Sequence, residues 1–185
     1  IEQEQRTFED SSTKIMAVRA VHLKLMNQAF QHLGATSLRK ELEQLSGALE
    51  HSGLKIGVRK VYASTFERLR GLVEQVKAAA GEIQVMLHTT FKELNTEFGF
   101  SLQAPTVLQL HDFDRELAQI EESYLQYLSF GNALKLANPL FGQRMVKALG
   151  MRLRTVYESA ANDLDLWSKS ATSQLDAQLK ERKRS

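Results

Sequence analysis

Apolar residues recur at every third or fourth position over residues 58–98, with no proline among them. This spacing matches one face of an α-helix. The stretch therefore predicts one helix of about 41 residues, roughly 60 Å long at 1.5 Å per residue. Ordinary globular helices have about 11–12 residues, so this one is typical of a stalk, spacer or bundle rather than of an enzyme built around a pocket. The apolar stripe consists of Val58, Tyr62, Phe66, Leu69, Val73, Val76, Ala80, Ile83, Leu87, Phe91, Leu94 and Phe98.

A second stripe of similar length predicts another long helix, from about Leu140 to Lys183. Two rods of equal length that carry apolar stripes pack most simply side by side. The spacing of the first stripe drifts towards fours and threes instead of strict sevens, which favours nearly straight helices over a tightly wound coiled coil. The second stripe consists of Met145, Leu149, Leu153, Val156, Ala160, Leu164, Trp167, Ala171, Leu175 and Leu179.

The N-terminal part of the chain predicts two further helices. The first runs from about Glu2 to Leu33 and ends at Gly34, a suitable C-terminal cap. Ser37 is a candidate N-cap for a second, short helix. Residues 51–53 indicate a break before the long helix, although a helix that continues through Gly53 is an open alternative, because glycine costs only about 1 kcal/mol there. The apolar face of the short helix consists of Leu38, Leu42, Leu45 and Leu49.

The middle of the chain predicts a loop, a helix and an apolar connector. Residues 99–112 contain Pro105 and lack helical spacing, so we expect a loop. Acidic residues then mark a helix start, and this helix runs to about Ser129. Residues 130–142 form a short connector of one or two turns. The whole chain, 1–185, is thus predicted to be all-α, a single elongated, stalk-like helical bundle with two long helices of about 40 residues and shorter ones.

Composition limits the classes of function. The 185 residues, 43% of them hydrophobic, suit one domain with a buried core. A net charge of +2 gives weak support for nucleic-acid binding, which normally leaves a concentrated basic face. The chain has no cysteine, which excludes disulfides and thiolate metal sites. It begins at Ile1 without a signal-peptide pattern, and we interpret it as a piece of a longer protein whose missing part holds any activity.

We find no catalytic, cofactor-binding or metal-binding motif. The chain lacks a P-loop and a His-Glu-x-x-His zinc signature, and none of its five histidines has a glutamate three residues before it. One acidic group could coordinate a hard cation, but helix capping explains it better. Trp167 is expected to pack in the core or against a partner, and the basic run at 180–184 suits a solvated helix end. The acidic group consists of His111, Asp112, Asp114 and Glu116.

The 130–142 connector and its flank concentrate apolar side chains beside lysine and arginine. This composition favours contact with anionic lipid headgroups or with a protein partner. In the alternative interpretation, the same side chains seal the end of the bundle against Phe98, Phe100 and Leu102. The candidate contact residues are Phe130, Leu134, Lys135, Leu136, Leu140, Phe141 and Arg144.

Three segments, Phe98–Pro105, Tyr127–Leu134 and Val156–Leu164, the last with Trp167–Ser170 after it, resemble the region that follows the GTPase domain in bacterial dynamin-family proteins. The resemblance covers roughly residues 54–184. It implies that a GTPase domain precedes this region, that the helical stalk mediates assembly, and that the far tip of the stalk approaches the membrane. GTP and magnesium are then expected only in the missing GTPase domain. The tip has no fixed motif in the family, so its assignment to the connector rests on composition.

The sequence therefore predicts a non-catalytic stalk of a dynamin-like, membrane-remodelling GTPase. Such a stalk would transmit nucleotide-driven motion and support self-assembly or membrane contact, in a cytoplasmic protein at the periphery of an anionic membrane. It would have no small-molecule substrate. The main alternative is a helical scaffold or coiled-coil adaptor that binds partner proteins and has no associated GTPase. A nucleic-acid-binding domain that uses the basic tail with Arg59, Lys60, Arg68 and Arg70 is the least favoured interpretation.

Overall fold

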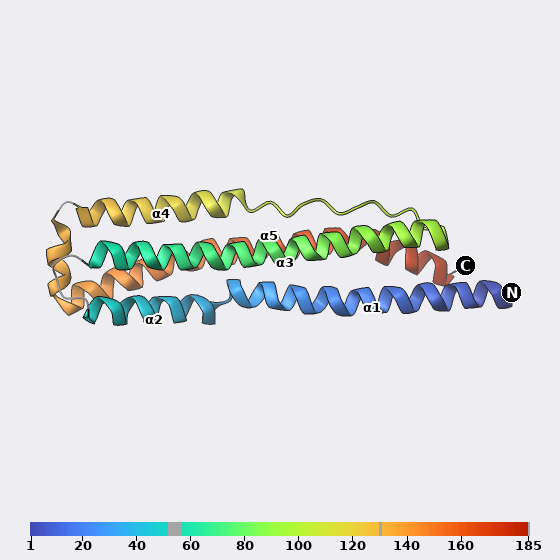
Figure 1. The fold of residues 1–185 in the computed structure, drawn as a ribbon, viewed down its shortest axis with the longest axis horizontal. Helices are drawn as coiled ribbons and strands as arrows, with labels where there is room; N and C mark the ends of the chain where they lie inside the picture. Colours follow the sequence, from blue (N-terminus) through green and yellow to red (C-terminus); the bar gives the residue numbers. More distant parts are fainter. Residues whose placement is uncertain (52–56, 130, 185) are drawn as a thin grey trace. The chain divides into compact units, whose positions relative to one another are not determined.

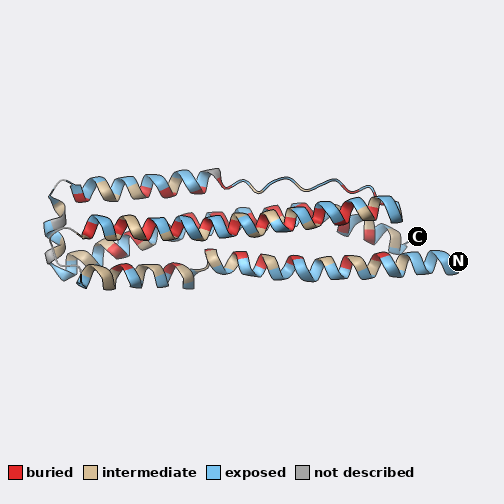
Figure 2. Ribbon diagram, in the orientation of Figure 1, coloured by how far each residue is buried: buried red, intermediate tan, exposed pale blue. Residues whose placement is uncertain are grey.

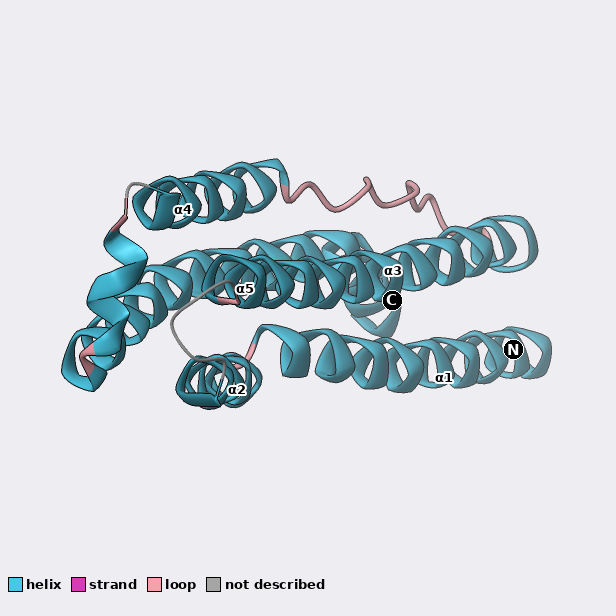
Figure 3. Ribbon diagram, turned by 60° about the vertical axis from the view of Figure 1, so that its left-hand side comes forward, coloured by secondary structure: helices cyan, strands magenta, loops and turns pink. Residues whose placement is uncertain are grey.

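The computed structural model describes residues 1–51, 57–129 and 131–184, and over these ranges the chain is helical apart from short connections and one loop (Figure 1). No strand occurs within these described ranges (Figure 3), so the all-α prediction is confirmed. The elements are α1 (Glu2–Leu33), α2 (Ala35–His51), α3 (Val58–Phe98), α4 (His111–Ser129), the 3₁₀-helix η1 (Asn132–Ala137) and α5 (Pro139–Arg184).

The two long helices form where the apolar stripes predict them. α3 has 41 residues with the predicted bounds, and α5 has 46, beginning and ending one residue outside the prediction. Every member of the α3 stripe is buried except the half-buried Phe98, and the α5 stripe is buried from Leu149 to Leu179 (Figure 2). α1 also has its predicted bounds. Burial of one continuous face, repeated every three or four residues, therefore accounts for helices this long.

Two predicted caps are wrong. Gly34 does not adopt the left-handed conformation of a C-terminal glycine cap; the described glycines with positive φ are Gly99 and Gly131. Ser37 is not the N-cap of α2, because α2 already begins at Ala35. The Ser37 hydroxyl instead donates to the carbonyl of Gln31 at 2.6 Å and so satisfies an acceptor in the last turn of α1.

Other boundaries follow the prediction closely. The loop occupies residues 99–110, and α4 begins at His111, the first residue of the acidic group. Gly99, with φ of 67°, ends α3, and the Phe100 amide returns to the Leu94 carbonyl at 3.3 Å. α2 ends at His51 and α3 begins at Val58, whereas the predicted break at Ser52–Gly53 lies outside the described residues.

The chain folds as two compact units. Unit 1 contains residues 1–29, 76–109 and 163–185, and unit 2 contains residues 30–75 and 110–162. Each unit takes parts of α1, α3 and α5, and α4 with η1 belongs to unit 2. The interpretation of residues 1–185 as one stalk-like bundle stays a prediction.

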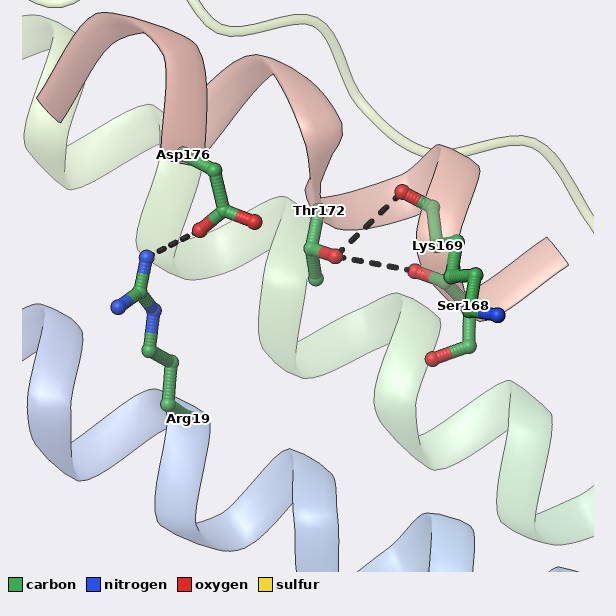
Figure 4. Close-up of polar contacts among 5 residues, drawn as sticks. All are labelled: Arg19, Ser168, Lys169, Thr172 and Asp176. Carbon is green, nitrogen blue, oxygen red and sulfur yellow. Dashed lines mark hydrogen bonds and ion pairs between the residues drawn. The ribbon is translucent and has the colours of Figure 1, made fainter. Parts of the chain in front are cut away.

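Unit 1 combines an apolar core with polar contacts between α1 and the other two helices. Lys14 pairs with Glu93 at 2.5 Å, and Arg19 pairs with Asp176. Figure 4 shows the guanidinium of Arg19 and the carboxylate of Asp176 facing one another from α1 and α5. In the same unit the buried His22 ring lies with Nε2 2.8 Å from the hydroxyl oxygen of Ser168. Burial lowers the pKa of His22, so its neutral form is favoured in the folded chain.

The 99–109 loop of unit 1 is held by side chains that bond to its main chain. The Asn95 amide bonds to both the N–H and the carbonyl of Leu102 at 2.8 Å, and the Gln178 amide does the same for Ser101 at 3.0 Å. The Trp167 indole donates to the Thr106 carbonyl at 2.7 Å. Along the loop these contacts come alternately from α5 and from α3, as an extended backbone allows. The residues that hold the loop are Asn95 and Gln84 of α3 and Gln174, Gln178 and Trp167 of α5.

Unit 2 has an aromatic core between α3, α4 and α5. Tyr62 stacks on Tyr124 with ring centroids 6.1 Å apart, and Phe113 lies 5.4 Å from Tyr157. The hydroxyls of Tyr62 and Tyr157 are buried without a hydrogen-bond partner among the described residues. Burial therefore raises the pKa of both groups, which stay protonated. α2 approaches α5 closely at Gly150, where an added Cβ would lie 2.8 Å from Leu42 Cδ1.

Candidate functional site

The connector between α4 and α5 has a defined backbone that begins with a left-handed glycine. Gly131 has φ of 79°, a conformation that glycine adopts without steric cost. The Asn132 side chain donates to the Tyr127 carbonyl at 2.9 Å and so satisfies an acceptor in the last turn of α4. The six-residue 3₁₀-helix η1 follows, and such short helices are common where helices are joined.

The other end of the connector carries the start signal of α5. The Asn138 side chain accepts a hydrogen bond from the Leu140 amide at 3.1 Å, as an N-cap does. Pro139 then occupies the first helical position, where its missing N–H costs nothing. The Asn138 carbonyl accepts from the amides of Phe141 at 3.0 Å and Gly142 at 3.2 Å. The connector is thus held at both ends by local hydrogen bonds.

The structure exposes four of the seven predicted contact residues. Leu134 and Leu140 have 70% and 63% of their surface accessible, and Lys135 and Arg144 are exposed with them. Leu136 and Phe141 are half-buried, and Leu136 lies over Gly142. Phe130 lies outside the described residues.

The alternative, in which the connector seals against Phe98, Phe100 and Leu102, stays a prediction. Phe100 is buried in unit 1, where the guanidinium of Arg182 lies 3.9 Å from its ring centroid. Leu102 is buried in the same unit, with both main-chain polar groups bonded to Asn95. Both residues therefore have partners within their own unit.

A groove of about 500 Å³ lies beside the connector in unit 2. α4 contributes two tyrosines and a serine to it, and α5 contributes apolar and basic side chains. Sequence reasoning identified Phe141 and Arg144 but missed the α4 wall and Arg152, because residues on different helices show no common spacing in the chain. The lining residues are Ser123, Tyr124, Tyr127, Phe141, Arg144, Met145 and Arg152.

The groove carries two arginines without acidic partners. Within the described ranges no carboxylate lies in ion-pair distance of Arg144 or Arg152, whereas Arg154 on the same helix pairs with Glu158 at 2.8 Å. The Arg152 guanidinium instead lies 6.0 Å from the ring centroid of Tyr124. Burial raises the pKa of the Tyr124 hydroxyl although Arg152 opposes this shift, so Tyr124 remains a hydrogen-bond donor.

Three of the other candidate residues from the sequence, Asp112, Arg68 and Arg70, have ion-pair partners. In the acidic group at the start of α4, Asp112 pairs with Arg115 at 2.7 Å. No cluster of three or more acidic or histidine side chains that could hold a metal occurs in the part of the chain that the structure describes. Of the basic residues considered for nucleic acid, Arg68 pairs with Glu41 at 2.8 Å and Arg70 pairs with Glu121.

Comparisons with known proteins do not test the resemblance to dynamin-family proteins. No family model, curated protein or solved structure matches this chain. Among the described residues, no helix is both long enough and apolar enough to cross a membrane. The dynamin-family stalk therefore stays a prediction.

Proposed function

We propose that this chain is a non-catalytic helical stalk that contacts anionic membrane surfaces through the α4–α5 connector. The observation that carries the proposal is the pair of exposed leucines, Leu134 and Leu140, on a backbone fixed by local hydrogen bonds. Lys135 and Arg144 are exposed beside them. Apolar side chains enter the boundary between headgroups and acyl chains, while adjacent cations remain at the anionic surface.

The dynamin-like part of the proposal rests on the sequence resemblance and on the two long helices. α3 and α5 each contribute to both units. A helix with a close-packed face is stiff, so these two helices suit the transmission of a nucleotide-driven movement along the stalk. The proposal assigns GTP hydrolysis to a separate GTPase domain.

A liposome co-sedimentation experiment tests the membrane contact. The variant Leu134→Asp with Leu140→Asp should bind vesicles of phosphatidylcholine and phosphatidylglycerol at least about tenfold more weakly, because two carboxylates replace two inserting side chains. The matched control is Val85→Asp with Leu166→Asp, which adds the same charge at residues that are 67% and 57% exposed outside the connector. Equal loss in both variants, or no loss in the connector variant, would contradict the proposal.

A measurement of GTP turnover by the full-length natural protein distinguishes a dynamin-like stalk from a helical scaffold. Turnover that these vesicles accelerate supports a dynamin-like stalk. A turnover rate that is the same with and without vesicles contradicts the proposed coupling between stalk and membrane. No nucleotide binding at all contradicts the dynamin-like assignment and favours a helical scaffold, for which exposed apolar residues such as Met16 and Leu23 on α1 provide a surface for partner helices.

A further inference from the structure

We propose that the groove between α4 and α5 binds the phosphate headgroup of one anionic phospholipid, whose first acyl carbons lie on the apolar wall. This inference rests on the proposed membrane contact and names its lipid class. It requires three properties of the groove: a suitable size, an apolar wall as well as a basic one, and a position beside the side chains that are proposed to enter the bilayer.

The size and the apolar wall of the groove suit part of a lipid. Its volume of about 500 Å³ lies within the usual range for small-molecule sites. The rings of Tyr127 and Phe141 and the flexible side chain of Met145 line it. A methionine adapts its shape to a chain of variable conformation, and aromatic rings give a large apolar surface.

The charge of the groove selects an anion. Arg144 and Arg152 both line it, and neither has a carboxylate partner among the described residues. A guanidinium presents parallel N–H donors that match phosphate oxygens. Arg154 nearby pairs with Glu158 at 2.8 Å, whereas both arginines that line the groove lack such a partner among the described residues.

The α4 wall supports and orients this basic side of the groove. Tyr124 stacks on Tyr62 with ring centroids 6.1 Å apart, and the Arg152 guanidinium lies 6.0 Å from the centroid of the Tyr124 ring. This contact restrains the arginine before a ligand arrives and reduces the entropy lost on binding. The hydroxyls of Tyr124 and Ser123 supply further donors for phosphate oxygens.

The position of the groove favours a lipid over free phosphate. Phe141 belongs to the groove and to the connector, and it follows the exposed Leu140 directly. A phospholipid held by the arginines would therefore lie next to the side chains proposed to enter the bilayer. Inorganic phosphate would leave the apolar wall unused.

The test replaces both groove arginines and compares two vesicle types. Arg144→Gln with Arg152→Gln should lose the preference for phosphatidylcholine vesicles that contain phosphatidic acid over pure phosphatidylcholine vesicles. We expect binding to the vesicles that contain phosphatidic acid to fall at least about tenfold, because the loss of one charge-assisted hydrogen bond has an effect of this size. The control, Arg115→Gln with Arg154→Gln, removes the same charge from two ion-paired arginines and should keep the preference. Equal losses in both variants would overturn the inference in favour of non-specific charge attraction.

A soluble lipid tests the groove without a bilayer. Dioctanoyl phosphatidic acid should bind to the unaltered chain in calorimetry, and Met145→Glu should weaken this binding while circular dichroism shows unchanged helicity. Inorganic phosphate binding as tightly as the lipid, or no lipid binding, would overturn the inference. If the connector variant Leu134→Asp with Leu140→Asp still abolishes vesicle binding in that case, the proposed function stands and the lipid groove alone fails.

Discussion

Replacement of Trp167 by alanine tests whether this residue stabilises the chain itself. The side chain is only 9% exposed, and its indole N–H donates to the Thr106 carbonyl at 2.7 Å. A buried tryptophan covers about 150–250 Å², which at about 25 cal/mol per Å² gives roughly 4–6 kcal/mol for full removal. Alanine recovers part of this area, and the carbonyl of the exposed Thr106 regains water. We therefore expect a loss of about 3–5 kcal/mol in the free energy of unfolding.

A second variant separates the two contributions. Trp167→Phe keeps most of the apolar surface and removes the hydrogen bond, so it should cost about 1 kcal/mol beyond the lost area. Both variants are unfolded in urea and followed by far-ultraviolet circular dichroism, because Trp167 is the single tryptophan and its fluorescence disappears with it. Sedimentation equilibrium is measured in parallel. A cost below about 1 kcal/mol for Trp167→Ala, together with dissociation of an oligomer, would refute the reasoning and place this side chain in an interface between copies.

Two further predictions concern pH and helix packing. Burial lowers the pKa of His22 below its ordinary value of 6.5, so at this position the unfolded chain binds a proton more readily than the folded chain. The free energy of unfolding should therefore fall as the pH drops below about 6.5. His22→Gln should flatten that dependence in urea titrations between about pH 7 and pH 5; an unchanged slope would exclude this role. Gly81→Ala should raise the free energy of unfolding by about 0.5–1 kcal/mol, because a Cβ there meets nothing within 4 Å. Gly150→Ala should gain less, since its Cβ lies 2.8 Å from Leu42 Cδ1, and thermal melts that rank these variants in the opposite order would contradict the packing at Gly150.

The helices could be predicted because their cause is local. A buried stripe at helical spacing is visible in the sequence, and so is the glycine that ends α3. The cap assigned to Ser37 was wrong because a serine near a helix start has several acceptors within reach. The Ser37 hydroxyl bonds to the Gln31 carbonyl because α2 begins directly after α1, which brings this carbonyl within reach.

The groove could not be predicted in full because its two walls come from different helices. Arg144 was identified from the composition of the connector, but Arg152 lies two turns further along α5 and pairs its charge with a ring on α4. Whether an arginine is free or neutralised also depends on contacts in three dimensions. The pair of Arg154 with Glu158, four residues further along the helix, can be predicted from the sequence, whereas the contact of Arg152 with the Tyr124 ring on α4 cannot.

The bonds that hold the 99–109 loop have a consequence for sequence variation. The five side chains from α3 and α5 bond to main-chain atoms, which every substitution in the loop except proline preserves. Exposed loop positions such as Ser101, Gln103 and Thr106 can therefore change identity freely over evolutionary time. An insertion or deletion of one residue, in contrast, shifts every later carbonyl and amide out of register with its amide or indole partner. Selection should consequently preserve the length of this loop much more strictly than its composition, the reverse of what is usual for a surface connection.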